Sequence, residues 1–242
     1  MTIDDFLDRL VGGLRNTLSD IRDFSDDPDA SIRPEYLKTI AVARVLKDSV
    51  EQSAWIKLEQ DTGRTLGASV LPDQRQPNFS KLVSRSGEID IVLGVNSNGW
   101  GYPVILIENK LFAAGYSTIE ADAIRCAEFV SAQGETGSIE VAAVTYFRRE
   151  TQGVVTSHQD RVGERALSRI TDAAANLATQ LNVMHRHKHI KLVSTAIANK
   201  EQALSEDEDG MPAYLAQPTY TIWGAVELFY RTPTPSRFYE LP

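Results

Sequence analysis

The chain has little cysteine and no long hydrophobic run, and both shortages narrow its class. A single cysteine, Cys126, excludes an internal disulfide and a cysteine-rich zinc site. No apolar run approaches the ~20 residues that a helix needs to span a bilayer, so we expect no membrane partner. The first residues carry no basic region ahead of an apolar one, and a signal peptide is not expected. These shortages together predict a cytoplasmic location.

Positive charge is also scarce. The chain has 25 lysines and arginines against 33 aspartates and glutamates, for a net charge of −8. A protein that coats nucleic acid usually has a strongly basic domain, so this balance argues against such a role. An enzyme that acts on nucleic acid remains compatible with it, because such an enzyme needs only a local basic strip and its metal-binding carboxylates add negative charge.

What is present is the composition of an ordinary globular protein. The 242 residues are 42% hydrophobic and 24% charged, and this length suits one domain with a substantial core. We expect a single domain over 1–242, with a core at about 34–198, an N-terminal amphipathic helix at 1–27 and a C-terminal extension at 199–242.

The chain alternates between helical and extended patterns. Thr2 and Asp5 have the spacing of a capping box, ahead of an amphipathic helix over 2–24. Pro34 fits the first turn of a second helix, which we expect to run through Trp55 toward Asp61. The remaining expected elements are strands at 66–71, 87–94, 104–110, 139–147 and 189–198, helices at 117–132 and 162–181, and a docking apolar piece at 220–230. This order predicts an α/β fold with a mixed central β-sheet flanked by helices.

Three charged residues stand out in the two central strands. Asp90 interrupts the apolar run at 87–94, and Glu108 and Lys110 end the run at 104–110. Acidic residues are depleted in strands, and buried charges are rare unless they are paired or bind a metal. Because side chains alternate along a strand, Glu108 and Lys110 share a face. An antiparallel hairpin centred on Gly99 would set Asp90 opposite Glu108, an alignment that is assumed from symmetry. The structural alternative is a strand pair whose ends carry a surface salt bridge.

Two carboxylates and an ammonium on one patch suit metal-assisted hydrolysis of a phosphodiester. Mg²⁺ typically takes one or two carboxylates, with water and substrate phosphate completing its shell. Asp90 and Glu108 supply that number, and the main-chain carbonyl of Asn109 is a candidate further ligand. The metal would activate a bound water, and Lys110 is placed to hold this water or to stabilise the transition state. We therefore expect Mg²⁺ as the cofactor, with Mn²⁺ able to substitute.

The spacing of these residues resembles a known family. Asp90, followed eighteen residues later by Glu108-Asn109-Lys110 at the end of an apolar strand, is similar to the signature of the PD-(D/E)xK nuclease superfamily. The resemblance implies a restriction-endonuclease-like core of helix–strand–strand–strand–helix–strand, and the expected elements match that order over about 34–198. It also implies that Asp90 and Glu108 bind Mg²⁺ and that Lys110 is catalytic.

Many members of that superfamily add a metal-binding glutamate from the helix before the sheet. Glu51 is the first candidate for that role here, ahead of Glu35 and Glu59. A solvated helix position is the alternative for Glu51, because sequence does not fix the phase of a helix to one residue.

Two features depart from the family pattern. Ile89 precedes Asp90 where the family name has proline, which is a common variation. Exonuclease-like branches carry Gln-x-x-x-Tyr on the following helix, whereas Arg125 and Phe129 hold that spacing here. This difference argues against the exonuclease-like branch.

Basic residues that follow the acidic ones are the candidates for phosphate contact. They are Arg125, Arg148, Arg149 and Lys188. Ordinary surface positions are the alternative for each of them.

The leading hypothesis is a metal-dependent nuclease that hydrolyses phosphodiester bonds in DNA, with restriction or anti-phage defence suggested by family analogy. A homodimer is a further expectation, because restriction-like enzymes often pair to cut both strands. The competing hypothesis is a catalytically inactive member that serves as a binding or assembly module. The acidic net charge and the amphipathic first helix support this second hypothesis.

Overall fold

The computed structural model describes most of the chain up to residue 152 and parts of the remainder. The described residues are 2–25, 35–48, 53–70, 83–97, 99–112, 117–131, 137–152, 172, 176, 179, 193–201, 205–206, 212–213 and 219–230.

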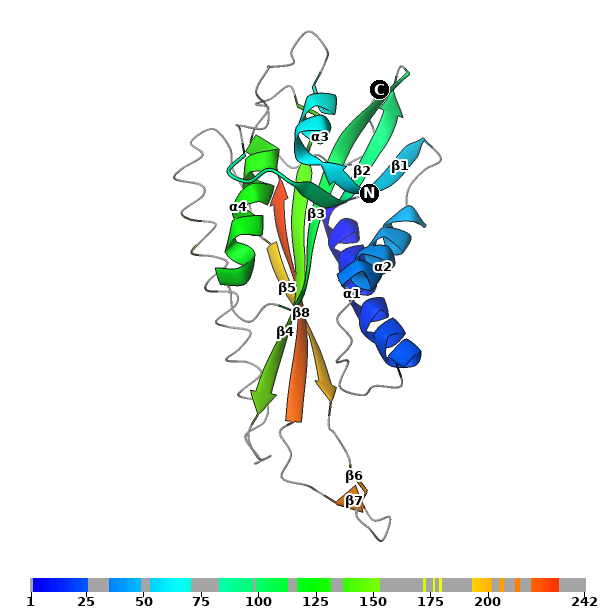
Figure 1. Cartoon of the computed structure of the whole chain (residues 1–242), viewed down its shortest axis with the longest axis vertical. Coiled ribbons are helices and arrows are strands. Elements are labelled where there is room, and N and C mark those ends of the chain that lie inside the picture. Colours follow the sequence, from blue (N-terminus) through cyan, green and yellow to red (C-terminus); the bar gives the residue numbers. More distant parts are fainter. Residues whose placement is uncertain are drawn as a thin grey trace.

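Six strands form one mixed sheet, in the order β1-β2-β3-β4-β8-β5 (Figure 1). Their bounds are β1 Ala54–Asp61, β2 Glu88–Ser97, β3 Trp100–Phe112, β4 Val141–Gln152, β5 Val193–Glu201 and β8 Thr219–Tyr230. β3 and β4 run parallel, and the other neighbouring strands of this sheet are antiparallel. A parallel pair needs a crossover connection, which is the helix between β3 and β4. A separate two-stranded ribbon joins β6 (Ser205–Glu206) to β7 (Pro212–Ala213).

Helices cover both faces of the large sheet, so the expected α/β class is confirmed (Figure 1). α1 (Ile3–Ser25) and α2 (Glu35–Lys47) pack on one face, over Ile91, Leu93 and Ile107. α3 (Thr62–Ala68) and α4 (Ser117–Ser131) cover the other face, over Val92 and Leu106. The alternation of Ile91, Val92 and Leu93 between the two cores follows the two-residue period of a strand.

The first helix begins as its sequence predicts and buries its apolar stripe. The Thr2 backbone N–H donates to the Asp5 carboxylate at 2.9 Å, and the Asp5 N–H donates to the Thr2 hydroxyl at 3.1 Å. The Thr2 hydroxyl also donates to that carboxylate, at 2.7 Å, and the two hydrogen bonds that the carboxylate accepts from Thr2 lower the pKa of Asp5. Phe6, Leu10 and Leu14 are fully buried in the core that α1 shares with α2 and the sheet. The stripe is therefore used inside the protein, which removes one support for an assembly role.

Two local predictions are wrong. The second helix ends at Lys47, and the residues expected to continue it form strand β1. The strand expected at 66–71 is replaced by helix α3, which the Asp61 carboxylate caps by accepting the N–H of Arg64 at 2.7 Å. An aspartate directly before a helical turn is a common start signal, but a seven-residue helix is too short to show a clear apolar period.

The later elements extend the sheet beyond residue 198. The apolar piece at 220–230 becomes β8, a central strand between β4 and β5. Val226, Leu228 and Phe229 are fully buried. The strands expected at 139–147 and 189–198 appear as β4 and β5, whereas the helix expected at 162–181 lies outside the described residues apart from three positions. No helix in the described parts of the chain is long and apolar enough to cross a membrane.

Candidate active site

From Ile91 to Leu93, the hairpin of β2 and β3 has the alignment that symmetry about Gly99 predicts, whereas a β-bulge after Leu93 shifts the pairing nearer the turn by one residue. Ile91 pairs with Ile107, and Gly99 lies in the turn at the other end with a φ of 79°. One step beyond the Ile91–Ile107 pair, this alignment leads to Asp90 and Glu108. There the Asp90 carboxylate accepts the backbone N–H of Asn109 at 2.5 Å. The side chain of one strand thus satisfies a backbone donor of the other, and this bond fixes Asp90 beside the end of β3.

Glu108 lies in the interior and is bound to an arginine of α4. Its side chain is 3% exposed, and one carboxylate oxygen forms an ion pair with Arg125, which is 2% exposed. Arg125 also donates to the carbonyl of Glu88 at 2.7 Å, and its guanidinium lies over the ring of Phe129. The phosphate contact expected of Arg125 is thereby corrected, because its charge is directed into the protein and not toward solvent.

Lys110 is held between acidic residues of two helices. Its ammonium lies 3.5 Å from Oδ2 of Asp122 in α4 and 4.0 Å from Oε1 of Glu35 in α2. Asp122 is itself buried, and its other oxygen accepts a 2.8 Å hydrogen bond from Arg85. Sequence analysis missed Asp122. Asp122 lies three residues before Arg125, so the two side chains share one face of the helix. An acidic and a basic residue on the buried face of a helix are the signal that could have identified Asp122.

The position of Glu35 bears on which helix-borne glutamate joins the site. Glu35 begins α2, and its charge raises the pKa of Asp90 as well as lying near Lys110. Glu51, the first candidate from sequence, lies outside the described residues. Glu59 is in β1, with an exposed side chain and a φ of 51°, and so is not on the helix before the sheet. Of the two candidates within the described residues, Glu35 and Glu59, Glu35 is the one that lies near the acidic cluster.

A buried lysine of α2 fixes the strand ends behind the site. Lys38 is fully buried, and its ammonium donates to the carbonyls of Lys110 and Thr145 at 2.7 Å each. Burial holds the pKa of Lys38 well below its usual value. The Asn109 side chain donates to Thr39 of α2 and accepts from Thr145 of β4. These bonds attach the ends of β3 and β4 to α2 and so set the backbone that carries Glu108 and Lys110.

Burial makes both carboxylates of the hairpin costly to ionise. It raises the pKa of Glu108 to about 7, against the opposing charge of Arg125 and with help from the charges of Asp90 and Asp122. It also raises the pKa of Asp90, against the hydrogen bond from Asn109 and the charge of Lys110. Two neighbouring carboxylates with raised pKa values are a donor set that a hard cation would stabilise in ionised form.

The pKa of Glu108 predicts how stability depends on pH. Because the folded state binds this proton more tightly than the unfolded state, whose value is near 4.5, the free energy of unfolding should fall as pH rises from about 4.5 to about 7. Glu108 alone should contribute a loss of about 3 kcal/mol over that range. Urea unfolding at several pH values would measure the slope, which should become shallower in Glu108→Gln. An unchanged slope in that variant would assign the titration to other groups.

For the remaining basic candidates, the structure describes no side chain at the acidic cluster. Arg148 and Arg149 lie on β4, two and three residues beyond Tyr146, the partner of Lys110 in the sheet. Lys188 lies outside the described residues.

The expected Mg²⁺ site has few candidate protein ligands. No group of three or more histidine, cysteine, aspartate or glutamate side chains is arranged to hold a metal ion within the described ranges. The pair Asp90 and Glu108 meets the lower requirement of Mg²⁺, for which one or two carboxylates suffice. The residues present therefore fit that cation, provided that Glu108 shares its charge between the metal and Arg125.

Fold and site together define a mixed α/β protein with a buried acidic cluster at the end of a central hairpin. No protein-family model matches the chain, and neither a curated protein nor a solved structure matches it. The functional argument therefore depends on the geometry of the cluster.

Proposed function

We propose that the chain is a metal-dependent nuclease of the PD-(D/E)xK type that hydrolyses phosphodiester bonds in DNA. One observation supports this most: the Asp90 carboxylate is bound to the backbone directly after Glu108, and Lys110 follows on the same strand. An aspartate, a glutamate and a lysine thus meet across two neighbouring strands. A surface salt bridge explains this poorly, because Glu108 is buried.

The order of elements supports a restriction-endonuclease-like core. With the short α3 set aside, α2, β1, β2, β3, α4 and β4 follow the sequence helix–strand–strand–strand–helix–strand. The first three strands are antiparallel neighbours, and α4 connects β3 to its parallel neighbour β4. This arrangement supports the proposal that the core has that fold.

The chain's own residues have distinct roles in the proposal. Asp90, Glu108 and the main-chain carbonyl of Asn109 would hold Mg²⁺ or Mn²⁺, with Glu35 replacing Glu51 as the helix-borne acid. When bound, the cation would lower the pKa of a water ligand and offset charge on the scissile phosphate. Lys110 would donate to a phosphate oxygen or to the attacking water.

A catalytically inactive binding module is the second candidate, and one contact favours it. The ion pair between Arg125 and Glu108 uses charge that a metal would otherwise engage. In an inactive member such a pair would replace the metal. In an active member, Arg125 would instead keep Glu108 ionised in its buried setting, since its charge lowers the pKa of Glu108.

A cleavage assay separates the two candidates. Purified protein is incubated with plasmid, single-stranded DNA and RNA, with Mg²⁺, with Mn²⁺ and with chelator. The nuclease proposal expects cleavage that needs metal, that Glu108→Gln abolishes, and that persists in Glu120→Gln, a matched change at an exposed position of α4. Intact substrates under every condition, or equal cleavage by Glu108→Gln, would favour the binding module.

A further inference from the structure

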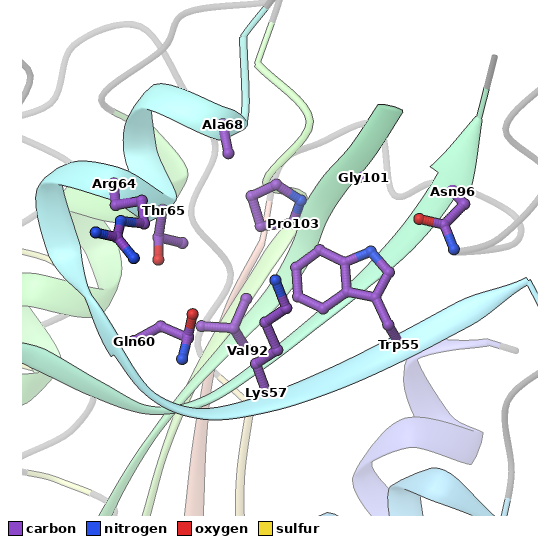
Figure 2. Close-up of a pocket in the computed structure, with 10 residues that line it drawn as sticks. All are labelled: Trp55, Lys57, Gln60, Arg64, Thr65, Ala68, Val92, Asn96, Gly101 and Pro103. Atoms are coloured by element: carbon purple, nitrogen blue, oxygen red, sulfur yellow. The ribbon is translucent and has the colours of Figure 1, made fainter. Parts of the chain in front are cut away.

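A pocket of about 520 Å³ lies beside the acidic cluster, between β1, α3 and the start of β3 (Figure 2). Figure 2 shows Arg64 and Thr65 of α3 across the pocket from Trp55 of β1, with Lys57 between them. Pockets of this size hold small ligands or single building blocks of larger ones. The proposed nuclease chemistry does not use these residues.

The ring of Trp55 is set in a recess that two glycines provide. A Cβ atom at Gly94 would lie 2.2 Å from the indole and 2.4 Å from the carbonyl of Tyr102. A Cβ atom at Gly101 would lie 3.1 Å from the indole nitrogen. A side chain at Gly94 would displace the ring, and one at Gly101 would crowd it, so the glycines of neighbouring strands leave room for a flat aromatic surface at the pocket wall. The ammonium of Lys57 lies over the ring, 4.9 Å from its centroid.

The pocket is positive in a protein that is negative overall. Lys57 and Arg64 line it with exposed side chains, and no aspartate or glutamate is among its lining residues in the described part of the chain. The net charge of the whole chain is −8, so two cations without a lining carboxylate mark a local preference for anions. Gln60 adds an amide that can both donate and accept hydrogen bonds. A flat ring, two cations and an amide match a ligand with an aromatic base and a phosphate.

The sheet register places this pocket next to the acidic cluster. Gln60 pairs with Ile89, the residue before Asp90, and Val92 of the pocket wall lies two residues after Asp90. A strand advances about 3.3 Å per residue, so Val92 and Asp90 are about 7 Å apart along β2. One nucleotide can span that distance.

We propose that this pocket binds one unstacked nucleotide of a single-stranded or locally opened nucleic acid. The Lys57 ammonium would move from the ring of Trp55 to the phosphate, which Arg64 also contacts, and the base would take its place on the ring. The inference rests on the proposed function, because the neighbouring phosphodiester would then lie at Asp90 and Glu108. A base within a duplex is stacked on both sides and cannot reach the ring. Stacking on an aromatic side chain tolerates any base, so the pocket selects single-strand character and not sequence.

The test measures binding and needs no cleavage. With chelator present, fluorescence anisotropy follows a fluorescein-labelled oligothymidylate and a closed hairpin duplex as they bind the full chain. The parent should bind the single strand more tightly than the duplex. Trp55→Leu should weaken single-strand binding by roughly 5- to 150-fold, the range that stacking provides per base, whereas Trp55→Phe should retain most of it.

If Trp55→Leu disturbs the fold, a variant that removes the two positive charges of the pocket tests the same inference. Lys57→Gln/Arg64→Gln changes two exposed side chains and should weaken single-strand binding. Because both cations are assigned to one phosphate, the slope of log affinity against log salt should be reduced by about 0.7. The matched control, Arg15→Gln/Lys47→Gln, removes the same charge from exposed positions on α1 and α2, across the sheet. The control should bind like the parent.

Three results would overturn the inference: equal binding of duplex and single strand, single-strand binding within twofold of the parent in both pocket variants, or thymidine monophosphate competing as well as the oligonucleotide. The last would assign the pocket to free nucleotides. Failure of the nuclease proposal is distinguishable, because absent cleavage together with Trp55-dependent strand binding would leave a single-strand binding module.

Discussion

Replacing Lys110 with methionine is expected to slow metal-dependent cleavage by roughly 10²- to 10³-fold, the usual cost of losing one donor that stabilises transition-state charge. The ammonium is the cation next to the carboxylate pair that is not buried, with a side chain 32% exposed. Lys38 and Arg125 are bound to internal partners, and the exposed Arg85 is paired with Asp122 of α4. Lys110 is therefore the group that can meet a substrate phosphate without breaking the core.

The fold should tolerate this change. Lys110 makes ion pairs at 3.5 Å and 4.0 Å, and partly exposed pairs of that kind contribute about 1 kcal/mol or less. Arg85→Met is a matched control, because it removes the other cation that contacts Asp122 and leaves Lys110 in place. Rates of plasmid cleavage and urea unfolding curves should be measured for both variants. If Lys110→Met cut as fast as the parent, the lysine would have only a structural role.

Sequence analysis predicted the hairpin because local signals agreed there. Two β-branched runs flank a turn with Asn98-Gly99, and side-chain alternation then fixes which residues share a face. The pairing of Ile91 with Ile107 follows from that pattern. The identity of Asp90, Glu108 and Lys110 as a cluster was thus available from the sequence, as was the capping box at Thr2 and Asp5.

The partners of those residues were not available, because contacts across elements distant in sequence decide them. Arg125 seemed a surface arginine from its sequence, but a carboxylate buried on β3 provides the charge that draws it inward. Lys38 bridges to a carbonyl that is 107 residues away in the chain. Glu35 lies near Lys110 because α2 begins near the strand ends, a matter of helix placement that composition does not reveal.

The glycine-lined recess around Trp55 could not be predicted from the sequence either. Gly94 and Gly101 belong to different strands, and their joint effect on Trp55 arises only after the β-bulge between Leu93 and Gly94 shifts the register. Trp55 itself was expected in a helix and instead lies in an edge strand. A register shift of one residue changes which side chains meet, so no pattern within one segment could have predicted this recess.

Replacing Arg125 with methionine should lower the free energy of unfolding by about 3–5 kcal/mol, the usual cost of removing one member of a buried ion pair. Methionine fills much of the same volume, so above pH 7 the loss would come from the Glu108 carboxylate, which at 3% exposure must either stay ionised without its cation or take up a proton. The carbonyl of Glu88 also loses its donor. Urea unfolding would measure the change.

The double variant Glu108→Gln/Arg125→Met identifies the source of that loss. Removing both charges leaves no unpaired ion, so the double variant should be more stable than Arg125→Met alone, and the cycle should show a coupling energy of at least about 1 kcal/mol. Strictly additive effects, or a loss below about 1 kcal/mol in Arg125→Met, would contradict the ion pair.

The same substitution should also change the pH dependence of the proposed cleavage. Arg125 lowers the pKa of Glu108, which burial otherwise raises to about 7, so Arg125→Met should raise that pKa further. Metal binding requires the ionised carboxylate; the acid limb of the cleavage profile should therefore move to higher pH, and raised Mg²⁺ concentration should partly restore the rate. A profile that stayed in place would mean that Glu108 does not hold the metal, because the charge that most strongly favours its ionised form would have been removed without effect.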